Sequence, residues 1–126
     1  MHLVPAGRRV LDGERVCQAI DALGERSNVA VWSSRFALLG DPSRLALLVA
    51  IAQAGPITVT DLAVATDLND TTVSHALRLL RAAGVVITHR DGHMIRYELA
   101  DADVGELLAH VIGLGSGLQR SNNPKG

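Results

Sequence analysis

Residues 58–84 read TVTDLAVATDLNDTTVSHALRLLRAAG, and this stretch decides the fold. Its first part predicts a short helix over 58–66, in which Leu62 and Ala65 are apolar and Asp61 suits the first turn. The residues DLND break that pattern, and Asn69 or Asp70 can cap a second helix over 70–83. Two short helices joined by about four turn residues describe a helix-turn-helix.

The second helix separates into an apolar side and a polar side when its residues are placed about 100° apart. The apolar side carries Val73, Ala76, Leu77, Leu80 and Ala83. The polar side carries Thr71, Ser74, His75, Arg78 and Arg81. Short hydrogen-bonding side chains near the start of the helix suit base edges in the major groove of DNA, and the arginines further along suit guanine edges or phosphates. A solvated helix face is the competing interpretation.

The residues after this helix favour the DNA interpretation because the hydrophobic period changes from 3.6 to 2. The runs VVITHR (85–90) and MIRYEL (94–99) flank DGH, and Asp-Gly between β-branched runs predicts a β-hairpin. A hairpin that follows a helix-turn-helix is the wing of a winged helix. Arg90, His93 and Arg96 would then lie where they can straddle phosphates.

The rest of the chain is mainly helical, so we expect a mainly α fold with about six helices and a small β-hairpin wing. Helices are predicted near 12–24, over 28–39 with Asn28 as its cap, and over 42–54 with Asp41 as its cap. A last helix should begin at Asp103, which forms a capping box with Glu106, and reach Leu114. We predict a flexible arm over 1–11, one DNA-binding and dimerisation domain over 12–118, and a flexible tail over 119–126.

Composition narrows the function classes. The net charge is −1 at pH 7, so a nucleic-acid partner must be inferred from local charge. The segment from Thr71 to Glu98 contains four arginines and two acidic residues, so its net charge is 4 − 2 = +2. No apolar run approaches the roughly 18 residues that span a bilayer, and no secretory signal is evident, so we expect a cytoplasmic protein without a membrane partner. Ser74 and His75 are adjacent but lack an orienting carboxylate, so we expect no enzyme.

The stretches FALLGDPSRLALLVAI, VTDLAVATDLNDTTVSHALRLLRAAGVV and RDGHMIRYELAD resemble the ArsR/SmtB family of bacterial winged-helix repressors. Together they cover about Phe36 to Asp101. The resemblance implies a homodimer, paired through its first and last helices, on an imperfect palindrome in duplex DNA. Carried over by position, the recognition-helix contacts are Thr71, Thr72, Ser74, His75 and Arg78, and Arg90, His93 and Arg96 belong to the wing. Many relatives have a second histidine at Ala76, and this departure leaves the base preference open.

The family resemblance also raises the question of a metal effector. Where relatives carry Asp-x-His on the last helix, this chain has Asp101-Ala-Asp103, and the later ligand positions fall on Leu114 and Gly117. What remains is Asp103, Glu106 and His110 on one helical stripe, which two protomers would bring together. Such oxygen and nitrogen ligands suit nickel, zinc or cobalt, with nickel or zinc preferred, and His2 is a further candidate ligand. A capping box beside an exposed histidine is the alternative.

We predict a homodimer, because two helices carry apolar stripes with more surface than one small core can bury. They are Val104, Leu108 and Val111 on the last helix, and Val29, Trp32 and Phe36 on the second. Two alternatives stay open: a winged-helix module that binds protein rather than DNA, and a thiol-responsive regulator that uses the single Cys17.

Overall fold

The computed structural model describes residues 7–24 and 26–113, and these fall into two compact units. We call residues 1–37 the N-terminal unit and residues 38–126 the winged unit. The predicted tail over 119–126 and the first six residues of the predicted arm lie outside the described residues.

The N-terminal unit is built from α1 (Gly13–Leu23) and most of α2 (Arg26–Leu39). Asp12 caps α1, because its carboxylate accepts from the backbone N–H of Arg15 at 3.1 Å. The first predicted helix is therefore confirmed. Asn28 was wrong as the cap of the second helix, since α2 begins two residues earlier at Arg26.

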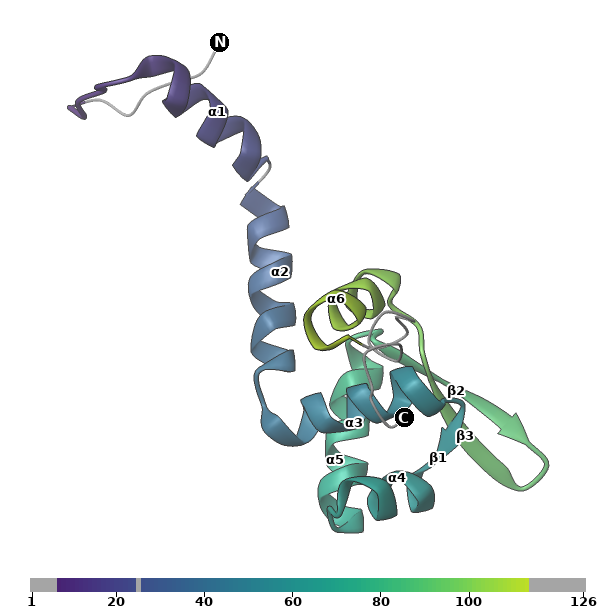
Figure 1. Cartoon of the computed structure of the whole chain (residues 1–126). Coiled ribbons are helices and arrows are strands. Elements are labelled where there is room, and N and C mark those ends of the chain that lie inside the picture. Colours follow the sequence, from purple (N-terminus) through teal and green to yellow (C-terminus); the bar gives the residue numbers. More distant parts are fainter. Residues whose placement is uncertain (1–6, 25, 114–126) are drawn as a thin grey trace, which may run out of the picture. The chain divides into compact units, whose positions relative to one another are not determined.

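The winged unit follows the predicted order of elements (Figure 1). Asp41 caps α3 and Pro42 occupies its first turn, as the sequence predicts. The helix-turn-helix and the hairpin follow, and the hairpin projects beyond the helices (Figure 1). The elements are α3 (Pro42–Ala54), β1 (Ile57–Thr58), α4 (Val59–Thr66), α5 (Asp70–Ala82), β2 (Val86–Asp91), β3 (Met94–Leu99) and α6 (Ala102–Ile112). The predicted fold class, a mainly helical winged helix-turn-helix, is confirmed.

The sheet has one strand that the sequence did not predict. Its order is β1-β3-β2, and the two-residue β1 pairs antiparallel with β3, so that Ile57 lies opposite Tyr97. The chain enters β1 through Gly55, where a Cβ would lie 2.6 Å from the carbonyl oxygen of Ile51 and 3.1 Å from that of Tyr97. Only glycine allows this close approach of α3 to β3 without a shift of backbone.

The core of the winged unit lies where α3, α4, α5 and α6 meet β2. Leu47, Leu80 and Val86 are fully buried in it. Val104 and Leu108 of α6 are buried in the same core. They were therefore wrong as part of an exposed dimer stripe, and the side chain of Val111 is outside the described residues.

The last helix is capped two residues earlier along the chain than predicted. The Asp101 carboxylate accepts from the backbone N–H groups of Asp103 and Val104, at 2.9 and 3.1 Å. The capping box of Asp103 with Glu106 was wrong, because Asp103 already lies inside α6. The helix ends at Ile112, with Gly113 left-handed at φ 84°.

In the described part of the chain, no single helix has the length and apolar character to cross a membrane. The segment from Asn28 to Leu39 reaches that length and apolar character only in combination with α3. The apolar residues Leu47, Leu48 and Ile51 of α3 are buried in the core of the winged unit.

Candidate nucleic-acid interface

One side of α5 is anchored in the core, and this fixes which side chains face outward. Val73, Ala76, Leu77 and Leu80 are buried, as the predicted helical period requires. The opposite side is exposed and carries Thr71, Ser74, His75, Arg78 and Arg81. The amphipathic assignment of this helix is therefore confirmed, except that Ala83 was wrong as part of the apolar side, because α5 ends at Ala82 and Ala83 is exposed.

The start of α5 is fixed by Asn69 rather than by Asp70. The Asn69 side-chain oxygen accepts from the backbone N–H of Thr72 at 2.8 Å. Asp70 is the first helical residue, and its carboxylate is exposed and forms no ion pair with any residue that the structure describes. The cap thus leaves the Asp70 carboxylate available at the outer end of the helix.

Two shallow grooves follow the exposed side of α5. The first, of about 340 Å³, is lined by Asp70, Thr71, Ser74, His75 and Arg78. The second, of about 490 Å³, is lined by Ser74, Arg78, Arg81, Ala82 and Tyr97. Ser74 and Arg78 line both, so the two grooves adjoin along the helix. The second groove brings the helix together with strand β3 of the wing.

The wing turns through two residues, Gly92 and His93, because Asp91 pairs directly with Met94. Gly92 has φ 65° at the first turn position, where two-residue hairpins of one common type require glycine. The register also separates the arginines. Arg90 lies opposite Ile95, whereas Arg96 lies opposite His89, one residue out of phase. Since side chains alternate along a strand, Arg90 and Arg96 lie on opposite faces of the hairpin.

Arg90 shares its face with Tyr97 and buried Val86, whereas Arg96 lies on the outer face of the sheet. The Arg96 guanidinium donates to the Asp91 carboxylate at 3.4 Å and to the Met94 sulfur at 3.5 Å. Its side chain is only 33% exposed. Arg96 therefore offers less free positive charge than its place in the sequence suggests.

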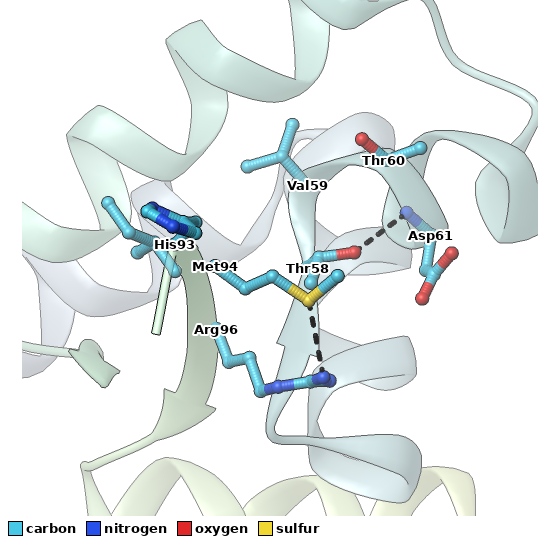
Figure 2. A pocket seen from close by; sticks show the side chains of 8 residues that line it. Thr58, Val59, Thr60, Asp61, His93, Met94 and Arg96 are labelled. Carbon is cyan, nitrogen blue, oxygen red and sulfur yellow. Dashed lines mark hydrogen bonds between the residues drawn. The ribbon is translucent and has the colours of Figure 1, made fainter. Parts of the chain in front are cut away.

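A third groove, of about 520 Å³, lies between the start of α4 and the tip of the wing. Figure 2 shows Met94 and Arg96 of β3 beside Thr58, whose hydroxyl accepts from the backbone N–H of Asp61 at 3.2 Å. His93 also lines this groove. The groove shares none of its lining residues with the two along α5. The structure thus brings His93 together with Arg96 and does not place Arg90 with them.

Acidic side chains balance the arginines over the whole helix-turn-helix and wing. Between Thr58 and Glu98 the arginines are Arg78, Arg81, Arg90 and Arg96, and the acidic residues are Asp61, Asp67, Asp70, Asp91 and Glu98. The sum is 4 − 5 = −1. The free positive charge is concentrated in Arg78, Arg81 and Arg90, for which no described residue forms an ion pair.

The positions of two residues relative to the α5 grooves differ from the sequence prediction. Thr72 is partly buried and lines neither of the α5 grooves, because it lies about 100° beyond Thr71 on the helix. Tyr97 was missed, although it lines the groove with Arg78 and Arg81. Side chains alternate along β3, so Tyr97 lies on the same face as Leu99, which packs against the core. The strand pattern could therefore have predicted the position of Tyr97.

The three predicted metal ligands do not meet within one chain. Glu106 and His110 are exposed on α6, and the seven residues from Asp103 to His110 rise about 10 Å along the helix axis. Among the described residues no three acidic, histidine or cysteine side chains are grouped to hold a metal. His2 lies outside the described residues, and Cys17 is a half-buried free thiol of α1.

Comparison with known proteins agrees with this geometry. The family model described as bacterial regulatory protein, arsR family, matches residues 41–88, from the cap of α3 into β2. The HTH-type transcriptional regulator NmtR of Mycobacterium tuberculosis is 42% identical over 80 residues, which are 64% of this chain and 66% of that protein. The chain spans less than two thirds of the length of the curated relatives that it matches.

Two solved structures are similar in both fold and sequence. One is the homodimeric winged helix-turn-helix DNA-binding domain, from Mycobacterium bovis, of a possible ArsR-family regulator. It has a TM-score of 0.60 and 32% identity over 70% of this chain and 81% of that one. The other is the cadmium metal-sensor CMTR from Mycobacterium tuberculosis, with a TM-score of 0.53 and 33% identity over 60% and 78% of the two chains. These are regulatory proteins rather than enzymes, and this chain belongs to the ArsR family of bacterial regulatory proteins.

Proposed function

We propose that this protein is a dimeric transcriptional regulator that binds duplex DNA and represses a promoter by occupying it. The observation that carries the proposal is the outward side of α5, where Ser74, Arg78 and Arg81 line a groove that continues to the wing. Family membership supports the same function. A regulator of this kind acts in the cytoplasm, where the chromosome is.

In this function α5 enters the major groove and its short side chains contact base edges. Thr71, Ser74 and His75 are the proposed contacts near its start, and we propose no base contact for Thr72, because it is partly buried and its backbone N–H donates to Asn69. Arg78 reads a guanine edge, and Arg81 contacts a phosphate or a second base. In the wing, Arg90 and His93 contact phosphates, and Arg96 does so only if it leaves Asp91.

Salt-dependent binding tests this assignment. Fluorescence anisotropy with a labelled duplex should show that affinity falls steeply as salt rises, because bound arginines displace counterions. Arg90→Ala should weaken binding to preferred and random duplexes alike. Arg78→Ala should weaken binding to the duplex that the native chain selects from a randomised library, the preferred duplex, by about 1–3 kcal/mol more than binding to random DNA. Equal losses on both duplexes would remove Arg78 from base recognition.

The same titrations separate DNA binding from the protein-interaction alternative. A winged-helix module that binds protein would lose no DNA affinity when Arg78 and Arg81 are both replaced by alanine. No change in that double variant would therefore overturn the proposed function. Arg15→Ala is the matched control, because Arg15 is exposed and already paired with Asp12 in α1. It should leave duplex affinity unchanged.

We propose a homodimer in which the N-terminal unit supplies the main contact. A groove of about 470 Å³ in this unit is lined mostly by apolar side chains, among them Leu23, Val29, Trp32 and Phe36. The Trp32 and Phe36 rings are 5.5 Å apart, and Arg35 lies over Trp32 at 4.9 Å from its centroid. A second copy is the proposed occupant because the related DNA-binding domain from Mycobacterium bovis is homodimeric.

For the effector we propose a divalent ion whose ligands come from two copies of α6. The name of the related cadmium sensor gives the class of effector, and Glu106 and His110 are exposed. One chain alone does not fit an ion, so the ligands Asp103, Glu106 and His110 must be shared between protomers. With a histidine, carboxylates and no thiolate, nickel or zinc is the proposed ion.

Calorimetric titration of the native chain with nickel and with zinc tests the effector. His110→Ala should abolish binding, because it removes the only nitrogen ligand of the proposed site on α6. Unchanged affinity in His110→Ala would exclude the α6 site. A version without residues 1–9 tests His2 in the same way, and Cys17→Ser tests the thiol-responsive alternative.

A further inference from the structure

The carboxylate of Asp70 forms no hydrogen bond or ion pair with any residue that the structure describes. Asn69 already caps α5, and Asp70 lies at the first helical position with its side chain in solvent. Its negative charge favours the positive end of the helix dipole, which is a stabilising role. Here it also lines the groove of Thr71, Ser74 and Arg78, which is the part of the proposed interface nearest the helix start.

Asp70 shares one side of the helix with the proposed base contacts. Ser74 and Arg78 follow it at four and eight residues, so all three fall within about 80° of the helix circumference. A side chain in this position approaches DNA whenever Ser74 does. A carboxylate there would be repelled by phosphates, and it can only accept hydrogen bonds.

We propose that Asp70 is a specificity-determining residue whose carboxylate accepts a hydrogen bond from the N4 amino group of a cytosine in the major groove. This inference rests on the proposed function. Cytosine is the base it fits, because cytosine presents a donor there, whereas guanine presents two acceptors and adenine places an acceptor beside its donor. The same carboxylate weakens contact with any sequence that offers no donor, so it adds discrimination rather than affinity.

The charge balance of the interface supports this role. In the α5 grooves Asp70 lies with the two arginines Arg78 and Arg81, so its carboxylate offsets part of their attraction for phosphates. An interface of this kind gains its preference for one sequence from base contacts and from repulsion at the wrong sequence. Asp70 is the acidic side chain that lines the α5 grooves, whereas Asp67 lies in the turn after α4 and lines neither.

Selection from a randomised duplex library tests the inference with three chains: native, Asp70→Asn and the matched control Asp67→Asn. Both variants remove one negative charge near the start of α5, and asparagine tolerates the left-handed backbone of residue 67, where φ is 57°. Thermal unfolding of each chain checks that it is folded.

We expect the native chain to select a cytosine at one position of each half-site. In Asp70→Asn that preference should fall about fivefold or more, while affinity for random duplex rises. Asp67→Asn should select the native sequence. If Asp70→Asn selects the same sequences as the native chain, Asp70 does not read a base and the inference is wrong. If the native chain enriches no sequence at all, the proposed function fails, and the inference fails with it.

Discussion

The two units of this chain differ most in where their apolar side chains lie. In the winged unit, leucines and valines from every helix are buried against one another, and Leu47, Leu62 and Val104 have no exposed surface. In the N-terminal unit no described residue from 7 to 37 is buried, and the Phe36 side chain is 55% exposed. One unit thus completes its core within a single chain, whereas the other presents an apolar surface that a second copy would cover.

Removing a core side chain from the winged unit should have the largest effect. Leu47→Ala deletes a fully buried side chain of α3, and we expect a loss of about 2–5 kcal/mol in the free energy of unfolding. Chemical denaturation measures it. Val64 of α4 is the matched control, because it is apolar but 78% exposed, and Val64→Ala should cost less than about 0.5 kcal/mol. Similar losses in both variants would contradict the core as described.

A charge on the apolar face of the N-terminal unit should separate the protomers. Phe36→Asp would place a carboxylate in the proposed contact, and we expect the dimer dissociation constant to rise about a hundredfold, or about 3 kcal/mol. Sedimentation velocity across a concentration series measures this. Val64→Asp adds the same charge to an exposed position of the winged unit and should leave the dimer intact. If the native chain is monomeric at micromolar concentration, a second copy does not cover the apolar surface of the N-terminal unit.

The entry into β1 should tolerate no side chain. Gly55→Ala would place a methyl group against two backbone oxygens, and we expect a loss of about 1–3 kcal/mol in unfolding free energy. Gly13→Ala is the control, because a Cβ there meets nothing within 4 Å at the start of α1. It should be neutral or slightly stabilising. Thermal unfolding with equal losses at both glycines would show that β1 does not lie as described.

The smallest effect is expected on the outer face of the wing. The side chains of His89 and Glu98 are hydrogen-bonded there, and each is nearly half exposed. Exposed pairs contribute between zero and about 1 kcal/mol, so Glu98→Gln should change unfolding free energy by less than that. Denaturant titration measures it, with Glu106→Gln as the control on α6. A loss above about 2 kcal/mol would mean that the wing depends on this pair.

Much of the winged unit could be predicted from the sequence because its signals are local. Asp41 before a proline, a period of 3.6 from Val73 to Leu80 and a glycine in the wing each specify one element without help from distant residues. The two-residue β1 could not be predicted, since a strand of that length has no period and exists through its pairing with β3. The cap of α6 was misplaced because Asp101 and Asp103 are equally good caps by residue type.

The candidate site could be predicted in part for the same reason. The polar side of α5 follows from its helical period, but which arginines remain free of ion pairs depends on the register of the hairpin. Arg96 pairs with Asp91 across a turn, and Arg90 lies on the other face. The stripe of Val104 and Leu108 was assigned to a dimer contact because periodicity shows that a face is apolar and does not show what covers it.

Selection of duplex DNA by the native chain tests the central claim most directly, because it requires the winged unit to read DNA and the N-terminal unit to pair two copies. The account predicts enrichment of an inverted repeat whose half-site centres are about one helical turn, or about 10 base pairs, apart. Enrichment of an isolated half-site would contradict the dimer, and no enrichment of any sequence would contradict recognition by α5.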